Sequence, residues 1–311
     1  MHTYAIGIDI GATNTVIGLV RDDARIMGKE TLPTQQYTES KPYIADIVEA
    51  IRKVMADCGV EAIERVGIGS PNSSYATGCI EENTVNLRFK ERIPICQMIT
   101  EALGVPSALD NDANAAALGE MVYGGAKGMT NFIVYTLGTG VGSGIVIDGQ
   151  VLRGVHGFAG ELGHVIVDPR GRQCGCGRVG CLETYAAAGA ICRNYLEAYA
   201  EMHGTEPTDE QKAITCKEVG MLATQGDKAA LAAYDKTAYW LGFALANAVA
   251  FSEPEGIFLF GGPTQVGEIL MKPLRKYFEE NLLFLYKGKV KLELSHLPSN
   301  DAAILGAAAL R

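Results

Sequence analysis

The chain has 311 residues, of which 48% are hydrophobic and 20% are charged, so it can bury a sizeable core and is long enough for two domains. Its formal net charge of −9 excludes the electrostatic attraction on which nucleic-acid binding usually depends. It shows no signal-peptide pattern and no stretch of the roughly 20 apolar residues that a membrane span needs, which predicts a cytoplasmic protein with neither membrane nor nucleic-acid partners.

The N-terminal third alternates short apolar runs with turn residues, and the first three runs indicate an antiparallel meander. The predicted elements are strands at Tyr4–Ile10, Thr15–Val20 and Ile26–Leu32, a helix at Tyr43–Cys58, strands at Arg65–Gly69 and Ser107–Leu109, and a helix at Ala113–Tyr123.

At Asn131 the opening pattern returns as strand, glycine-rich turn and strand. Setting DIGATNTVIGLV over TLGTGVGSGIVI aligns the two turns and their flanking strands, which predicts two domains of like topology that each contribute a glycine-rich hairpin. The elements expected after this repeat are helices at Tyr185–Glu201 and Lys228–Ser252, strands at Ile257–Phe260 and Val290–Leu294, and a helix at Ala302–Leu310.

Both glycine-rich turns suit phosphate groups. In Asp9–Thr15, small residues let backbone amides approach phosphate oxygens, and Thr13 and Thr15 can add hydroxyl donors. Leu137–Gly144 is a denser version with four glycines. An ordinary hairpin turn explains either loop alone, whereas two loops on facing domains can hold a triphosphate from both sides. Neither loop is a P-loop or a dinucleotide fingerprint, because each leads into a strand, and hydride chemistry is therefore disfavoured.

Polar residues crowd the junction between a predicted strand and a predicted helix, at Asp110, Asn111, Asp112 and Asn114. Helix capping explains one such residue as well as chemistry does, but it does not account for four. A carboxylate directed into a cleft between the domains could orient a hydroxyl group and accept its proton during attack on a γ-phosphoryl group. Such a reaction asks the protein mainly for positioning and charge neutralisation.

The most specific local pattern is a histidine followed by three cysteines, His164, Cys174, Cys176 and Cys181. Three thiolates and an imidazole within eighteen residues suit tetrahedral Zn²⁺, and the intervening glycines let the chain fold around one ion. Four protein ligands leave no open position on the metal, which predicts a structural role. The other cysteines are scattered and indicate no disulfide framework.

Two glutamates flank this pattern, since Glu161 precedes His164 by three residues and Glu183 follows Cys181 by two. Either could be a solvated surface acid. Next to a zinc site beside a cleft, both can accept hydrogen bonds from sugar hydroxyls. His164 can bind zinc through one ring nitrogen and face the substrate with the other.

Together these motifs resemble the ROK family of bacterial sugar kinases and repressors, part of the actin-like ATPase and hexokinase superfamily. DIGATNT is similar to the family's first phosphate loop, LDNDANAAALGE to its catalytic segment, LGTGVGSGIVIDG to its second phosphate loop, and GELGH with CGCGRVGCLE to its zinc and sugar signature. The resemblance covers essentially the whole chain. It implies an α/β fold, the two-domain actin-like ATPase (ribonuclease H-like) fold with an interdomain active-site cleft. The implied domains are residues 1–115, on which a C-terminal helix at about 300–311 packs back, and residues 116–299, which carry the second phosphate loop and the zinc site.

The resemblance also implies the reaction, an ATP-dependent phosphorylation of a hexose hydroxyl with Asp112 as general base, Mg²⁺ bound with ATP, a structural Zn²⁺ and a homodimer. The implied sugar ligands are Asn86, Asn111, Asp112, Glu161, His164 and Glu183. The implied nucleotide residues are Gly11, Thr13, Thr139 and Gly140 at the phosphates, Asp9 on Mg²⁺ through water, and Gly261 and Gly262 near the nucleoside. The implied zinc ligands are His164, Cys174, Cys176 and Cys181.

Two departures from the family pattern bear on these expectations. GATNT replaces the frequent GGTK, so phosphate binding depends more on amides and Mg²⁺, and Ser70-Pro71-Asn72 replaces a usual Pro-Gly on the sugar-facing side. Glucose is the leading substrate, with N-acetylmannosamine, N-acetylglucosamine, allose and fructose as alternatives. A sugar-sensing repressor is disfavoured, because the first strand begins at Tyr4 without a preceding helix-turn-helix and the chain is acidic. A sugar-binding protein without catalysis is disfavoured because Asp112 and both loops are intact.

Overall fold

The structure is a computed structural model that describes residues 2–82, 87–298 and 301–311, and it divides into two compact units. Unit 1 contains Met1–Gly128, Arg153–Ala159 and His296–Arg311, and unit 2 contains Met129–Leu152 and Gly160–Ser295. The chain therefore passes from one unit to the other after residues 128, 152, 159 and 295.

Unit 1 is built on a five-stranded mixed sheet with the strand order β3-β2-β1-β4-β7. The meander β1–β3 is antiparallel, whereas β4 and β7 are added parallel to β1. These strands are β1 (Tyr4–Ile10), β2 (Asn14–Arg21), β3 (Ile26–Pro33), β4 (Arg65–Gly69) and β7 (Ser107–Asp110), and the short strands β5 (Ser73–Ser74) and β6 (Cys79–Ile80) form a separate pair. The predicted meander is confirmed, with shifts of at most one residue at the strand ends.

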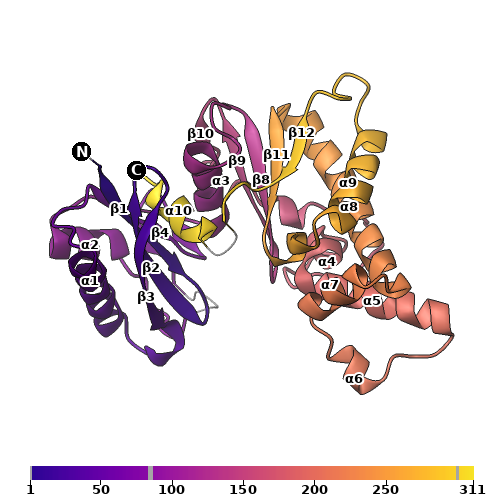
Figure 1. The fold of residues 1–311 in the computed structure, drawn as a ribbon, viewed down its shortest axis with the longest axis horizontal. Coiled ribbons are helices and arrows are strands. Elements are labelled where there is room, and N and C mark those ends of the chain that lie inside the picture. Colours follow the sequence, from indigo (N-terminus) through magenta and orange to yellow (C-terminus); the bar gives the residue numbers. More distant parts are fainter. Residues whose placement is uncertain (1, 83–86, 299–300) are drawn as a thin grey trace. The chain divides into compact units, whose positions relative to one another are not determined.

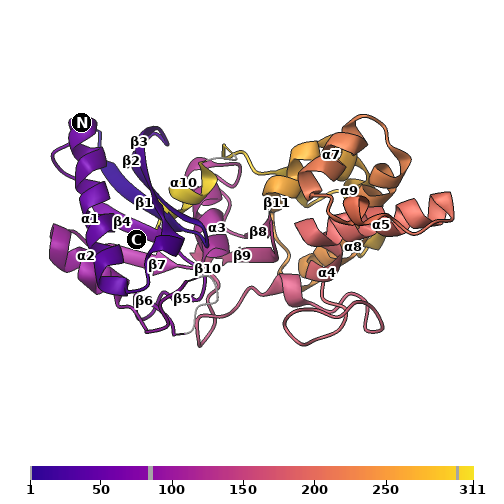
Figure 2. The same cartoon turned by 90° about the horizontal axis from the view of Figure 1, so that it is seen from below.

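Helices cover both faces of this sheet (Figures 1 and 2), with α1 and α2 on one side and α10 on the other. Their bounds, with that of the helix after β7, are α1 (Ser40–Asp57), α2 (Ile95–Leu103), α3 (Asp112–Tyr123) and α10 (Ala302–Ala308); a short 3₁₀ turn, η1 (Thr34–Gln36), precedes α1. The face toward α1 is lined by large apolar residues such as Ile6 and Ile8. On the other face α10 approaches so closely that a Cβ at Gly67 would lie 1.8 Å from the carbonyl oxygen of Ala307. Glycine is required there because no side chain fits.

Unit 2 repeats the same sheet, with the order β10-β9-β8-β11-β12. A hairpin of β8 and β9 is antiparallel, and β11 and β12 are added parallel to β8. The strands are β8 (Phe132–Leu137), β9 (Val141–Ile147), β10 (Gln150–Val151), β11 (Gly256–Phe260) and β12 (Lys291–Leu294). The expected duplication of topology is confirmed, since the strand orders and directions of the two sheets correspond one to one.

The helices of unit 2 pack against this sheet and against one another around a core that includes Ile133, Tyr135 and Leu245. They are α4 (Glu183–Ala186), α5 (Ala188–His203), α6 (Asp209–Lys212), α7 (Cys216–Thr224), α8 (Lys228–Ser252) and α9 (Glu268–Asn281), with the 3₁₀ turns η2 (Leu162–His164) and η3 (Gly262–Val266). The prediction of α8 is confirmed at both ends. The helical stretch expected over Tyr185–Glu201 consists of two helices, because Ala187 is extended, with φ −69° and ψ 163°, and separates α4 from α5.

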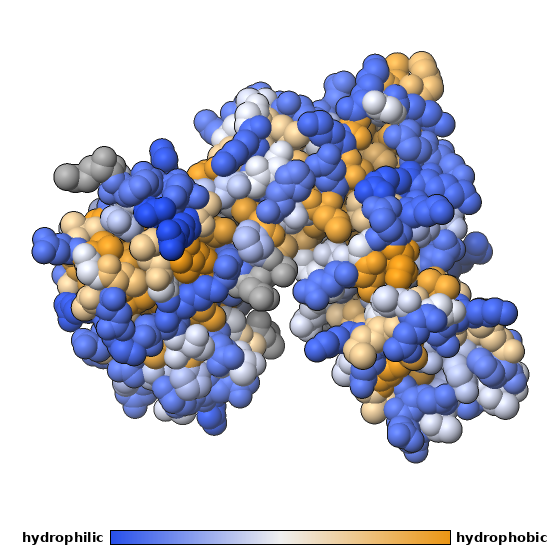
Figure 3. Space-filling model, viewed as in Figure 1, coloured by the Kyte–Doolittle hydropathy of each residue, from blue (hydrophilic) through white to orange (hydrophobic). Residues whose placement is uncertain are grey.

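Among the described residues, no helix is long and apolar enough to cross a membrane. Polar side chains cover most of the face shown in Figure 3, and the apolar residues on it form separate patches.

Candidate functional site

The carboxyl ends of β1, β4 and β7 meet at one edge of the unit 1 sheet. The strand register pairs Asp9 with Gly69 and Gly69 with Asp110, so the two carboxylates lie on either side of a glycine. In parallel sheets ligands bind beyond the carboxyl ends of the strands. This edge therefore carries the part of the candidate site that unit 1 contributes.

Asn111 and Asp112 have different roles at the start of α3. Asn111 is the helix N-cap, and its Oδ1 accepts hydrogen bonds from the backbone N–H groups of Ala113 (2.9 Å) and Asn114 (3.1 Å). Asp112 is the first helical residue, and its Oδ1 accepts only the N–H of Ala113 at 2.9 Å among the described residues. Asn111 thus supplies the cap, and Asp112 is not needed as the capping residue.

The carboxyl groups of Asp9 and Asp112 both lie in surroundings that shift their pKa. Burial, together with the nearby charge of Asp112, raises the pKa of Asp9 from 3.8 to about 6. The side chain of Asp112 reaches the surface, but desolvation by the surrounding protein also raises its pKa. The hydrogen bond from the Ala113 N–H lowers this pKa, and its effect is the smaller one. A raised pKa makes a carboxylate a better proton acceptor near neutral pH.

The turn after β1 is closed by a hydrogen bond from the N–H of Gly11 to the carbonyl of Asn14 (3.0 Å). Thr13 is exposed and its side chain is available to a ligand. Thr15 corrects the expectation from sequence: it is fully buried, and its hydroxyl shares hydrogen bonds with the hydroxyls of Thr34 (2.9 Å) and Tyr43 (2.6 Å). Thr15 supports the fold and cannot reach a phosphate.

The second glycine-rich turn shares a cavity of about 490 Å³ in unit 2 with η3, the turn that follows β11. Gly138 and Thr139 line one part of this cavity, and Gly262 lines another. Gly261 adopts φ 119°, and a Cβ there would lie 2.0 Å from the carbonyl oxygen of Leu137, so only glycine allows the two strand ends to come together. The structure thus joins Thr139 and Gly262, which sequence reasoning had placed in one nucleotide site, in one cavity.

The four predicted zinc ligands converge in unit 2, with their ligand atoms all within 4.8 Å of one another. The Sγ atoms of Cys176 and Cys181 are 3.7 Å apart, and Nδ1 of His164 is 3.7 Å from Sγ of Cys174. Sulfurs about 2.3 Å from a tetrahedral Zn²⁺ lie about 3.8 Å apart, so the cluster fits the ion. Burial raises the pKa of Cys174 and Cys181, so the thiols need a cation to hold their thiolates.

Glu183 connects this cluster with the second glycine-rich turn. Its Oε1 lies 3.7 Å from Sγ of Cys174, and its Oε2 accepts the N–H of Val141 at 3.1 Å. Glu161 is exposed and immediately precedes η2, whose His164 N–H donates to the Glu161 carbonyl (3.0 Å). One ring nitrogen of His164 faces the cysteines, which leaves the other for a ligand.

The sequence matches the ROK family over residues 5–311. The chain belongs to the ROK family. It is 35% identical to a glucokinase from Halalkalibacterium halodurans, over 97% of this chain and 93% of that protein, and 36% identical to a glucokinase from Thermotoga maritima, over 98% and 96%. A crystal structure of a ROK glucokinase from Streptomyces griseus in complex with glucose and AMPPNP superposes with a TM-score of 0.78, at 30% identity over 98% of both chains.

The site residues predicted from the sequence are distributed over both units. Those in unit 1 are Asp9, Gly11, Thr13, Asn111 and Asp112, and those in unit 2 are Thr139, Gly140, Glu161, His164, Cys174, Cys176, Cys181, Glu183, Gly261 and Gly262. Asn86 lies outside the described residues.

Sequence reasoning missed two residues that hold the ROK signature segment in place. Ser143 is buried on β9, where its hydroxyl donates to the carbonyl of Gly160 and accepts the N–H of Leu162 (3.1 Å). Arg172 donates to the carbonyl of Thr184 (2.7 Å) on α4 and to Glu197 (2.6 Å) on α5, which connects the segment before Cys174 to both helices. The position of Ser143 between two glycines was the one sequence signal for its role. No sequence signal pointed to Arg172.

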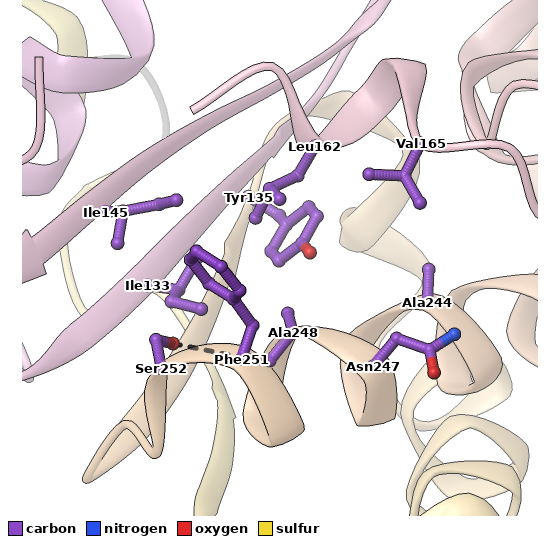
Figure 4. A pocket seen from close by; sticks show the side chains of 10 residues that line it. All are labelled: Ile133, Tyr135, Ile145, Leu162, Val165, Ala244, Asn247, Ala248, Phe251 and Ser252. Atoms are coloured by element: carbon purple, nitrogen blue, oxygen red, sulfur yellow. Dashed lines mark hydrogen bonds between the residues drawn. The ribbon is translucent and has the colours of Figure 1, made fainter. Parts of the chain in front are cut away.

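A smaller cavity of about 310 Å³ in the same unit has a different character (Figure 4). Leu162, the first residue of η2, and Val165, which follows η2, line it together with Tyr135, Ala248 and Phe251. Its lining is almost entirely apolar, so it does not suit a sugar or a phosphate. We therefore assign neither substrate to it.

Proposed function

We propose that this ROK protein is an ATP-dependent hexose kinase with glucose as its substrate and Asp112 as its general base. The observation that carries the proposal is the placement of Asp112 on the first turn of α3, with Asn111 acting as the cap in its place and with a raised pKa. The similarity to glucokinases at 35% and 36% identity over nearly the whole chain supports the reaction class.

In this proposal Asp112 accepts the proton of a sugar hydroxyl as that oxygen attacks the γ-phosphorus of ATP. Phosphoryl transfer needs little more of the protein than orientation of the hydroxyl and neutralisation of charge. Asn86, Asn111, Glu161, His164 and Glu183 would orient the sugar through its other hydroxyls. Only the side-chain oxygen of Asn111 serves as the helix cap. Its amide nitrogen donates no hydrogen bond within the described chain and can therefore donate to a sugar hydroxyl.

The nucleotide would be held by backbone amides more than by cations. Gly11 and Thr13 in unit 1, and Thr139 and Gly140 in unit 2, present small or hydroxyl-bearing residues on tight turns, and Gly261 and Gly262 would lie near the nucleoside. The carboxyl group of Asp9, next to Asp112, fits a hard cation that prefers oxygen ligands, so Asp9 would hold Mg²⁺ through water. Mg²⁺ bound there would neutralise phosphate charge.

The zinc cluster would be structural. His164, Cys174, Cys176 and Cys181 would fill all four positions of the ion, and the bound ion would keep the loop beside Glu183 rigid.

Glucose is proposed because the similar proteins reported above are glucokinases and one of them is solved with glucose. N-acetylmannosamine, N-acetylglucosamine, allose and fructose remain alternatives, since the hydroxyl-binding residues serve all of these sugars. The homodimer and the domain boundary near residue 115 are likewise proposals, which sedimentation analysis and limited proteolysis can test.

A coupled assay of ADP release over these five sugars tests the function. We expect the highest kcat/KM with glucose, and a loss of about 10²- to 10⁴-fold in kcat for Asp112→Asn, because the amide cannot accept the proton. The variant keeps the size of the side chain, so its thermal unfolding serves as the control for folding. Turnover of none of the sugars, or an Asp112→Asn variant as fast as the wild type, would contradict the proposal.

A further inference from the structure

A buried ion pair lies directly beside the proposed base. The carboxylate of Asp110, on the last residue of β7, is only 4% exposed, and Oδ2 accepts Nε of Arg153 at 2.8 Å, with Nη2 also 2.8 Å away. Its other oxygen, Oδ1, accepts the backbone N–H of Asn111 and Nδ2 of Asn114, each at 2.9 Å. Each oxygen therefore has two donors, and the acceptor capacity of the carboxylate is filled.

The contacts of Asp110 fix the residues on both sides of Asp112. Asn111 supplies the α3 cap, and its backbone N–H is held by Asp110, while Asn114 on the same first turn is buried and is oriented by the same oxygen. A carboxylate accepts from the amide nitrogen of Asn114, which fixes which way that amide points. The start of α3 is thus set by Asp110 in addition to its own cap.

Arg153 comes from a different part of the chain. It opens the segment Arg153–Ala159, which belongs to unit 1 although the residues before and after it belong to unit 2. Its guanidinium lies 3.7 Å over the ring centroid of Tyr75, and its side chain is 24% exposed. The pair therefore anchors this segment, which lies between two of the chain's passages from one unit to the other, to β7, which ends two residues before the candidate base.

We infer that Arg153 and Asp110 are positioning residues for the transfer: the ion pair holds Asp110, and Asp110 holds the first turn of α3 so that the Asp112 carboxylate meets the sugar hydroxyl. This inference rests on the proposed function. Neither residue needs to touch a substrate for it. A displacement of about 1 Å at a reacting group can cost about 100-fold in rate, so a positioning defect would show in kcat.

Charge and hydrogen-bond chemistry predict how variants of the pair behave. Arg153→Met leaves a buried carboxylate without its cation. Asp110→Asn places an NH₂ group, itself a donor, against either the donors of Arg153 or those of Asn111 and Asn114. In the double variant, the new amide's NH₂ group can face the uncharged side chain that replaces Arg153, while its oxygen keeps the bonds to Asn111 and Asn114. The two single changes should therefore be strongly non-additive.

The experiment measures kcat and KM for sugar and for ATP in the wild type, Arg153→Met, Arg153→Lys, Asp110→Asn and the double variant. Arg275→Met is the matched control, because Arg275 forms an exposed pair with Glu268 (2.8 Å) on α9. We expect Arg153→Met to lose about 10- to 100-fold in kcat with each KM within about threefold of the wild type, and the control to be unchanged. Arg153→Lys keeps a cation and should recover part of the loss in kcat. If Arg153→Met does not fold, the same comparison is made with Arg153→Lys.

The double variant should be faster than the product of the two single effects predicts. A raised KM at unchanged kcat, multiplicative single effects, or Arg153→Lys no faster than Arg153→Met would overturn the inference. An active wild type with an equally active Arg153→Met variant would also overturn it and leave the proposed function standing. A wild type that phosphorylates no sugar would instead overturn the proposed function, and the inference with it.

Discussion

Glu183 accepts the backbone N–H of Val141 at 3.1 Å, and this hydrogen bond joins the start of α4, next to the cysteine cluster, to the start of β9. The same carboxylate lies 3.7 Å from Sγ of Cys174. Gly140 leaves the space that the carboxylate fills, since a Cβ at that position would lie 2.5 Å from Oε2. The proposed sugar-binding glutamate is therefore in direct contact with the proposed phosphate loop of unit 2. A substitution that moves one of them should displace the other.

Gly140→Ala should reduce kcat/KM for the sugar by about 10- to 100-fold, because the new methyl group displaces the Glu183 carboxylate from the Val141 N–H. Steady-state kinetics check this. Gly189→Ala is the control, since a Cβ at Gly189 on α5 meets no atom within 4 Å and alanine favours the helix. Full activity in Gly140→Ala would show that the position of Glu183 is not needed for turnover.

Zinc should be present at about one ion per chain and should be lost in Cys176→Ser. Removal of one ligand leaves buried thiols at Cys174 and Cys181 without their cation, so the midpoint of thermal unfolding should fall by at least about 5 °C. Metal analysis and calorimetry measure the two effects. Cys192→Ser alters a cysteine of α5 outside the cluster and should keep the zinc. A wild type that contains no zinc and is fully stable and active would refute the assignment.

Helices and strands could be predicted from the sequence where a local pattern of apolar residues determines them, and not where distant contacts do. The period of α8 and the apolar run of β1 were read correctly, because each element buries a regular pattern of its own. Helix α9 was missed, since Pro273 lies inside it. The break at Ala187 is tertiary in origin: the N–H of Ala188 leaves the helical pattern to donate to the carbonyl of Gly138 at 2.8 Å. No residue near Ala187 signals that partner.

The candidate site could likewise be predicted only where residues close in the sequence form it. The zinc ligands lie within eighteen residues, so their convergence could be predicted from spacing and was found in the structure. The pairing of Arg153 with Asp110 spans 43 residues, and Arg153 alone is an ordinary arginine after a strand. Thr15 was misjudged because its partners, Thr34 and Tyr43, come from later elements. A side chain's availability depends on such distant partners, which one sequence does not reveal.

Asp9→Asn should stabilise the protein at about pH 8 while it impairs activity. The pKa of Asp9 is raised from 3.8 to about 6, so between these values the folded chain binds more protons than the unfolded chain. Stability therefore falls as pH rises through this window, and ionised Asp9 costs at most about 3 kcal/mol above it. Asparagine removes that cost, so the gain should appear above about pH 6 and vanish below about pH 4.

Urea unfolding across this pH range measures the gain, and kinetics at varied Mg²⁺ should show a raised requirement for Mg-ATP. Asp57→Asn, at the exposed end of α1, is the control and should change neither. The combination of higher stability and lower activity is the decisive result, because a group retained at a stability cost is retained for function. An Asp9→Asn variant that is less stable at about pH 8 would contradict the raised pKa, and one that is equally active would contradict a role of Asp9 in binding Mg²⁺.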